Sequence, residues 1–209
     1  MIKPWLKCSY PKEQFDWFFN GGWEQWADDY RGRIFNDRDI QSKRNSPARH
    51  HYFHEWFSAI TIFNRYGLRS LVGKYATKDA AHRNKVETIR EIVSQDVWNA
   101  IKTPVTGTKD PKAGLPDLFV YSDGNKTEWF FAEVKGPRDK ISKKQEMKSD
   151  SLDQAAGKNV VRLIELEATT ERFTPPPPHP RPRVTVVGHC LAERYETSVA
   201  GEFESTAKT

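Results

Sequence analysis

The sequence predicts a mixed α/β domain in which helices flank a sheet. Two strand-like segments, residues 115–122 and 127–135, are joined by the turn-forming residues 123–125 and fit an antiparallel hairpin. A helical segment and an apolar strand follow, at residues 141–157 and 159–167. Helical patterns also precede the hairpin. The order helix, hairpin, helix, strand is typical of a mixed α/β domain.

Composition limits the classes of protein to consider. The 209 residues fit one domain with extensions, with 37% hydrophobic and 29% charged residues and a net charge of +5. That charge favours a polyanionic partner and an ordinary soluble basic protein about equally. Cys8 and Cys190 form neither a disulfide framework nor a CxxC metal motif, which indicates a reducing compartment. Without an apolar run long enough to cross a bilayer, we expect a cytoplasmic site of action and no membrane partner.

The segments before the hairpin are predicted to be helical. Residues 1–50 are rich in tryptophan and charge and predict a helical N-terminal extension of short helices and loops. Residues 55–67 are densely apolar, which predicts a largely buried helix that begins at Glu55 and ends at Gly67. Residues 78–101 predict one amphipathic helix. Its polar faces carry Lys85, Glu87, Arg90 and Glu91.

The remaining boundaries follow from breaker residues. Residues 103–114 are rich in proline, glycine and lysine and predict a loop before the hairpin. We place the core domain at residues 51–170. The proline-rich residues 171–183 predict an extended linker, and residues 184–209 a C-terminal strand and tail.

The second strand of the hairpin carries the candidate chemistry. Side chains alternate across a strand, so Glu133 and Lys135 share one face. Counting outward from the turn brings Asp117 within a residue or two of Glu133. Two carboxylates about 4 Å apart repel by roughly 4 kcal/mol at an effective dielectric near 20, so a cation is expected between them. Mg²⁺ fits, because it binds few carboxylates together with water and phosphate oxygens. The alternative is an exposed cross-strand pair beside an acidic turn residue.

The motifs GLPDLFVY and AEVKGPRDKISKKQ resemble the VRR-NUC branch of the PD-(D/E)xK nucleases, over about residues 113–167. The matching positions are Gly114, Pro116, Asp117, Leu118, Glu133, Val134, Lys135, Gly136, Pro137, Asp139, Ile141, Ser142 and Gln145. The resemblance implies a restriction-endonuclease-like core. It is nearest to the Fanconi-associated nuclease type, whose members cut branched or flapped DNA with Mg²⁺ or Mn²⁺.

The resemblance also implies roles for individual residues. Asp117 and Glu133 are expected to bind the metal together with the backbone carbonyl of Val134, and Lys135 is expected to be the catalytic lysine. The family completes its metal site with an acidic residue from an upstream helix. We expect Glu55, because a carboxylate at the mouth of a buried helix needs a partner. Glu87 and Glu91 are the alternatives.

The helix after the motif predicts nucleic-acid contacts. Its opening is rich in cations, which fits phosphate contacts that do not read sequence; a solvated helix face is the alternative. The residues expected to contact DNA are Arg138, Lys140, Lys143, Lys144, Gln145 and Lys148. The histidine-rich residues 50–55 are not a zinc motif, because Ser58 stands where H-E-x-x-H needs its second histidine.

These observations favour a Mg²⁺- or Mn²⁺-dependent DNA endonuclease over a catalytically silent nucleic-acid-binding module. Two biological roles remain open at this stage. One is an antibacterial toxin, delivered by a secretion system and neutralised by a cognate immunity protein. The other is a phage or cellular repair nuclease that acts on branched DNA. RNA also remains open as a substrate.

Overall fold

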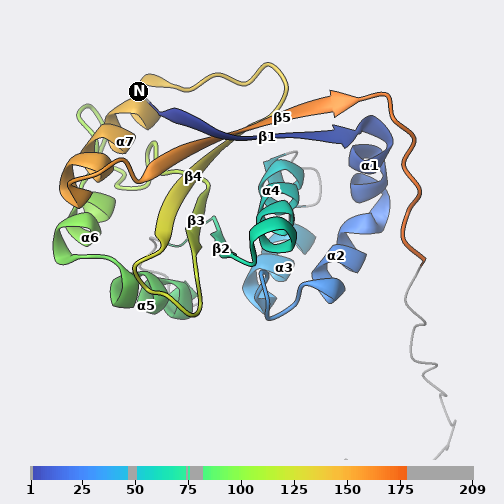
Figure 1. The fold of residues 1–209 in the computed structure, drawn as a ribbon, viewed down its shortest axis with the longest axis horizontal. Helices are drawn as coiled ribbons and strands as arrows, with labels where there is room; N and C mark the ends of the chain where they lie inside the picture. The colour runs from blue at the N-terminus through green and yellow to red at the C-terminus, as the bar shows by residue number, and fades with distance from the viewer. Residues whose placement is uncertain (1, 47–50, 74, 76–81, 178–209) are drawn as a thin grey trace, which may run out of the picture. The chain divides into compact units, whose positions relative to one another are not determined.

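The computed structural model describes residues 2–46, 51–73, 75 and 82–177. Within them the chain forms a five-stranded mixed sheet with helices on both faces (Figure 1). The strand order is β1-β5-β4-β3-β2. The strands are β1 (Lys3–Pro11), β2 (Arg69–Val72), β3 (Leu118–Tyr121), β4 (Trp129–Lys135) and β5 (Val161–Thr169). The predicted fold class, a mixed sheet flanked by helices, is therefore confirmed.

The predicted hairpin is formed by β3 and β4. The two strands are antiparallel with Leu118 opposite Ala132, and the Ser122 N–H donates to Glu128 O at 3.1 Å where the loop closes. Strand β2 pairs antiparallel to the outer side of β3, whereas β5 runs parallel to β4 and β1 runs parallel to β5. The sheet is therefore antiparallel on one side of β4 and parallel on the other.

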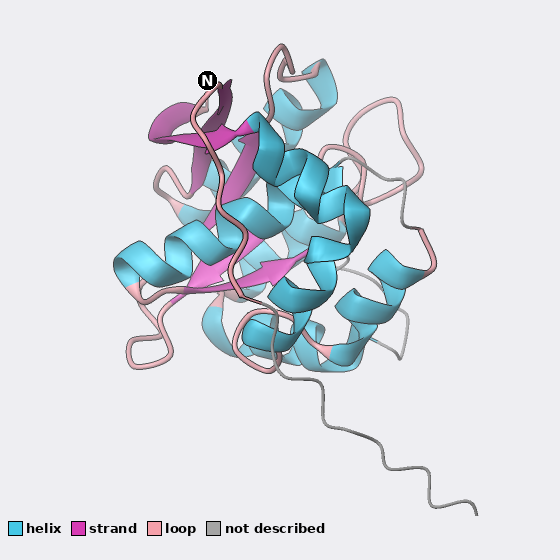
Figure 2. Cartoon of the chain, turned by 90° about the vertical axis from the view of Figure 1, so that its right-hand side faces the viewer, coloured by secondary structure: helices cyan, strands magenta, loops and turns pink. Residues whose placement is uncertain are grey.

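Each face of the sheet is covered by its own group of helices (Figures 1 and 2). One group is α1 (Lys12–Trp17), the π-helical turn η1 (Phe18–Gly22), α2 (Trp23–Asp29), α3 (Asp37–Arg44) and α4 (His51–Tyr66). The other group is α5 (Arg83–Ile92), α6 (Gln95–Lys102) and α7 (Lys143–Ala156). The sheet thus separates two hydrophobic cores. No helix among these described segments is long and apolar enough to cross a membrane.

Helix α4 is the central element of the first core. Phe53, Trp56 and Ile62 are completely buried, and Gly67 ends the helix with a φ of 67°, as its position in the sequence predicted. The start of the helix differs from the prediction. Its described part begins at His51, so Glu55 lies in the second turn and not at the mouth. The predicted start was too late, because Tyr52 and Phe53 in the first turn are already buried in the first core.

The helix predicted over residues 78–101 is two helices, α5 and α6, in its described part. Ser94 breaks it and caps α6, since its Oγ accepts a hydrogen bond from the Val97 N–H at 3.4 Å. Lys85 was expected on a polar face, but it is buried with 3% of its surface exposed. Its charge is compensated by the carboxylate of Asp39, on a helix distant in the sequence.

Residues 1–50 contain the expected short helices, but the prediction missed β1. This strand buries Leu6, Cys8 and Tyr10, alternate residues of one face, against the first core. The alternation is short and interrupted, with a register irregularity between Pro4 and Leu6, so it gave only a weak strand signal.

Beyond β5 the chain is extended. Residues 170–177 run over α1 and α2 (Figure 2), where Phe173 packs on Trp17 with ring centroids 5.4 Å apart and Gln25 Nε2 donates to Pro177 O at 3.0 Å. The strand expected within residues 184–209 lies outside the described residues.

Candidate metal and nuclease site

The hairpin brings Asp117 and Glu133 together. Asp117 directly precedes β3, and because Leu118 lies opposite Ala132, Asp117 comes opposite Glu133. The Asp117 carboxylate accepts a hydrogen bond from the Val134 N–H at 2.8 Å, and its carbonyl accepts one from the Gly73 N–H at 3.0 Å. The turn before it is also held, since the buried Tyr75 hydroxyl donates to Pro116 O. Asp117 is therefore fixed against both neighbouring strands.

Glu133 and Lys135 lie on one face of β4, as predicted. Lys135 Nζ is 2.7 Å from Glu133 Oε1. Glu133 is buried, whereas 14% of the Lys135 side chain is exposed. The ammonium therefore links a buried carboxylate to the solvent side of the site.

Gln145 joins this pair from the first turn of α7. Its amide nitrogen donates to Glu133 Oε1, and its amide oxygen accepts from Lys135 Nζ at 3.2 Å. The same oxygen accepts the Ser142 N–H at 2.9 Å, while Ser142 Oγ accepts the Gln145 N–H at 3.3 Å, which completes a capping box. Gln145 was predicted to contact DNA, and the structure places its amide against Glu133 and Lys135.

Glu133 has one carboxylate oxygen with no hydrogen-bond partner, Oε2, and this atom is buried. An unpaired buried carboxylate oxygen is unfavourable, so the position suits a cation. Burial, and next the charge of Asp117, raise the pKa of Glu133 to about 8. Burial also raises the pKa of Asp117, against the opposing hydrogen bond from the Val134 N–H. Burial is the main cause of both shifts, and the Lys135 ammonium offsets it only in part.

Among the three candidate upstream acids, Glu55 is the one near this pair. Burial and then the charge of Asp117 raise its pKa well above the ordinary value, and Glu133 contributes further. Glu87 and Glu91 are exposed on α5, and Glu91 pairs with Lys126 at 3.3 Å on the surface. Across the described residues, no three carboxylate, imidazole or thiol side chains converge as a ready metal-binding group. Two carboxylates nevertheless suit Mg²⁺, which retains several water ligands.

A buried ion pair lies behind Glu55, and the sequence did not reveal it. Lys85 Nζ contacts the Asp39 carboxylate and donates to Val72 O at 2.6 Å, at the end of β2. Gly73 follows, and a Cβ there would lie 3.6 Å from Glu55 Oε2. Lys85 therefore fixes the strand end that Glu55 faces. Tyr75 was also missed, because nothing in its local pattern distinguishes it.

Two motif glycines explain how the elements approach one another. A Cβ on Gly136 would overlap the ring of His54, and a Cβ on Gly114, whose φ is 75°, would overlap the backbone of Lys144. The first contact brings α4 to the end of β4, and the second brings α7 to the turn before Asp117. His54 also meets the Tyr10 hydroxyl at 3.3 Å, so this histidine packs between β1, α4 and the end of β4.

The predicted cationic residues divide into two groups. Arg138, Lys140, Lys143 and Lys144 are exposed around the turn after β4 and the start of α7. Lys148 is fully buried, and its ammonium donates to the carbonyls of Ala100, Ile101 and Thr103 at 2.9, 3.1 and 2.7 Å. The predicted DNA contact of Lys148 is therefore wrong: this lysine caps the C-terminal end of α6.

Comparison with known proteins agrees with this geometry. Residues 65–165 match the family model of the VRR-NUC domain. The match includes Asp117, Glu133, Lys135 and Gln145, and it begins after Glu55. No curated protein and no solved structure gives a significant match.

Proposed function

Because the chain carries a VRR-NUC nuclease domain at residues 65–165, we propose that it is a metal-dependent DNA endonuclease that hydrolyses phosphodiester bonds. We further propose that it selects DNA by structure or acts without sequence preference. The observation that carries the proposal is the buried Glu133 carboxylate. One of its oxygens is held by Lys135 and Gln145, and the other has no partner.

Asp117, Glu133, the backbone carbonyl of Val134 and Glu55 are the proposed ligands of Mg²⁺ or Mn²⁺. Such an ion, when bound, polarises a phosphodiester and lowers the pKa of a coordinated water. The chain supplies the alignment, because Asp117 is fixed by the Val134 N–H and Glu133 by the Gln145 amide. The raised pKa values of both carboxylates, caused mainly by burial, mean that a bound cation would favour their charged forms.

Lys135 is the proposed catalytic lysine. Its ammonium is anchored on one side by Glu133 and Gln145, and its partial exposure directs the remaining N–H donors towards the solvent side. There it can orient an attacking water or stabilise negative charge that develops on the phosphoryl oxygens. Gln145 thus acts as a positioning residue for both members of the pair.

The exposed cations beside this site are proposed to hold the DNA backbone. Arg138, Lys140, Lys143 and Lys144 follow Lys135 in the chain and line the turn into α7. Lysine and arginine contacts of this kind bind phosphates without reading bases, which suits a substrate defined by shape.

Two biological roles are compatible with this chemistry. The domain is proposed either as an antibacterial toxin, delivered by a secretion system and held inactive by an immunity protein, or as a nuclease that acts on branched DNA in repair. Growth arrest and DNA breaks on expression in bacterial cells, both lost in Glu133→Gln, support the toxin. Preferential cleavage of flaps or junctions without toxicity supports the repair role.

The proposed activity is tested by cleavage of supercoiled plasmid, branched DNA and RNA with Mg²⁺, Mn²⁺ or EDTA. We expect metal-dependent cleavage by the wild type and its loss in Glu133→Gln and Lys135→Ala. Glu91→Gln is the matched control, because it removes a carboxylate from a surface ion pair with Lys126. Absence of cleavage in every metal, or full activity in both site variants, refutes the proposal.

A further inference from the structure

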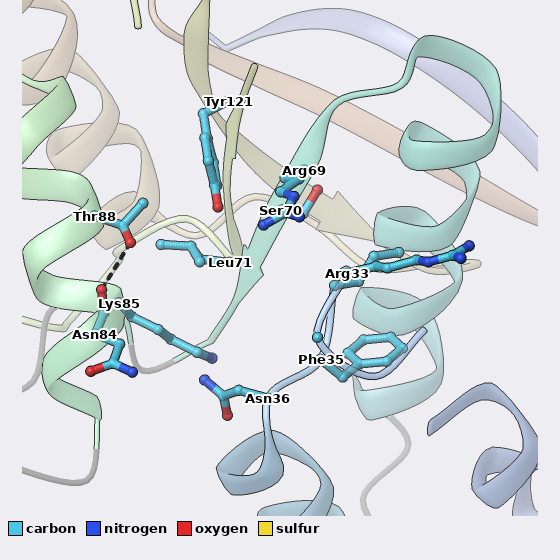
Figure 3. A pocket seen from close by; sticks show the side chains of 12 residues that line it. Arg33, Phe35, Asn36, Arg69, Ser70, Leu71, Asn84, Lys85, Thr88 and Tyr121 are labelled. Atoms are coloured by element: carbon cyan, nitrogen blue, oxygen red, sulfur yellow. Dashed lines mark hydrogen bonds between the residues drawn. The ribbon is translucent and has the colours of Figure 1, made fainter. Parts of the chain in front are cut away.

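A pocket of about 120 Å³ with a mixed polar and apolar lining lies beside the site, at the outer edge of the sheet. Figure 3 shows its walls: the turn that carries Arg33 and Asn36 on one side, and α5 with Asn84 and Thr88 on the other. Strand β2 lies between them. Because a water occupies about 30 Å³ of liquid, the pocket has room for roughly four waters, or for one group of phosphate size.

Ser70 is the residue that indicates a ligand site in this pocket. It lines the pocket, it is only 1% exposed, and its hydroxyl has no hydrogen-bond partner. Its backbone faces the same edge. The Gly73 N–H bonds to Asp117 O in the antiparallel ladder, so residues 70 and 72 direct their N–H and C=O groups away from β3. Lys85 Nζ, which binds Val72 O, confirms this direction.

The pocket wall offers many more donors than acceptors. Arg33 is exposed at its rim, and Arg69 enters from β2 while Asp123 binds its Nε at 2.6 Å. Asn36 Oδ1 already accepts the Asp39 N–H, which leaves the amide nitrogen for the pocket. With the Arg69 guanidinium, an amide nitrogen and the Ser70 hydroxyl, the lining suits an anion with several acceptor oxygens. The exposed Arg33 adds a positive charge at the rim, where Figure 3 shows its side chain directed away from Ser70.

The pocket and the carboxylate site share a wall. Lys85 lines the pocket and binds the carbonyl of Val72, and the next residue, Gly73, lies against Glu55. Strand residues rise about 3.3 Å each, so Arg69 lies roughly 13 Å along β2 from Gly73. Each nucleotide of a duplex strand rises about 3.4 Å along the duplex axis, so a duplex aligned with β2 would place the two positions about four nucleotides apart. Any other direction of the strand gives fewer.

From this arrangement we propose that the pocket binds a phosphate group of the nucleic-acid strand, within a few nucleotides of the phosphate at the carboxylate site. The proposal rests on the proposed nuclease function and assigns it a second contact point on the substrate. The pocket would fix the strand while the cations of α7 hold the backbone on the other side of the site.

The first test is binding of a fluorescent DNA duplex in EDTA, where no cleavage occurs. Arg33→Ala should weaken binding about tenfold and lower the slope of log affinity against log salt by about 0.7–0.9. Ser70→Ala should weaken binding about threefold while leaving thermal stability unchanged or higher, because it removes an unpaired buried hydroxyl. Arg31→Ala is the matched control on the same turn, since Arg31 pairs with Asp37 at 3.8 Å and does not line the pocket.

The second test locates the phosphate. Duplexes carry a single neutral methylphosphonate at successive positions, with and without a 5′-phosphate. One position should weaken binding by the wild type and have no further effect on Arg33→Ala. The proposal is overturned if Arg33→Ala and Ser70→Ala keep wild-type affinity and salt dependence, or if Arg31→Ala loses as much affinity as they do. It is also overturned if no methylphosphonate position behaves in this way. A protein that binds as expected but does not cut contradicts only the proposed function.

Discussion

Removing the charge of Glu133 should stabilise the metal-free protein, increasingly as the pH rises. The folded-state pKa of Glu133 is about 8 against an ordinary value of 4.5. A raised carboxylate pKa means that the folded protein binds this proton more tightly than the unfolded chain. The contribution is therefore fully favourable below about pH 4.5 and is lost as the pH rises through 8. Each pH unit between these values changes the free energy of unfolding by about 1.4 kcal/mol.

At pH 7 this amounts to an order of 3 kcal/mol relative to Glu133→Gln, since 7 lies about 2.5 above the ordinary pKa. The loss of the ion pair with Lys135 is already contained in this figure, because Lys135 lowers the pKa of Glu133 against burial and Asp117. Asp117 and Glu55 titrate in the same direction, so the difference between wild type and variant is the informative quantity.

The assay is urea unfolding in EDTA from pH 5 to pH 9. The wild type should lose stability relative to Glu133→Gln up to about pH 8, and Mg²⁺ should restore stability at pH 8 to the wild type alone. Glu91→Gln, at an exposed ion pair, should follow the wild type. If the free energies of unfolding of wild type and Glu133→Gln changed with pH in parallel, the folded protein would not raise the pKa of Glu133.

Two further predictions concern packing and charge. Gly136→Ala should destabilise the protein by about 1–3 kcal/mol in denaturant, because its Cβ overlaps the His54 ring, and His54→Ala should restore part of the loss; an unchanged midpoint would contradict this. Lys148→Met should also lower the free energy of unfolding, by about 1–3 kcal/mol, because the lysine caps α6. It should leave the salt dependence of DNA binding unchanged. Lys144→Ala, at an exposed position, should lower the salt dependence of DNA binding and leave the free energy of unfolding unchanged. If both variants changed the same quantity, the assignment of Lys148 to the helix cap and Lys144 to DNA would be wrong.

The core of the site was predictable because it depends on local rules. Strand alternation placed Glu133 and Lys135 on one face, and the position of the turn placed Asp117 opposite Glu133. For the upstream acid, the sequence allowed only a ranking of three candidates, with Glu55 ahead of Glu87 and Glu91. No local pattern tells which of the two helices approaches the carboxylate pair, since that depends on contacts between distant segments, such as His54 of α4 with Gly136 after β4.

Helix α7 shows why the remainder was not predictable. Lys148, Ser149 and Leu152 are buried and Gln145 is partly buried, and these four positions follow the spacing of a helix face that packs on a core. Three of these four are polar residues, and only Leu152 is apolar. A search for hydrophobic periodicity therefore finds no packed face there and assigns Lys148 to the solvent. Lys148 is buried because it caps the end of α6, and Gln145 is partly buried because its amide contacts Glu133 and Lys135.

The same residues also show why position 145, in the first turn of α7, carries an amide and not a carboxylate. A glutamate at position 145 would complete the capping box with Ser142 as well as glutamine does. It would, however, place a second carboxylate against Glu133, whose pKa is already raised to about 8. Glutamine accepts the helix N–H and the Lys135 ammonium through its oxygen, and donates to Glu133 through its nitrogen. Helix capping alone therefore does not select this residue; the chemistry of the neighbouring strand does.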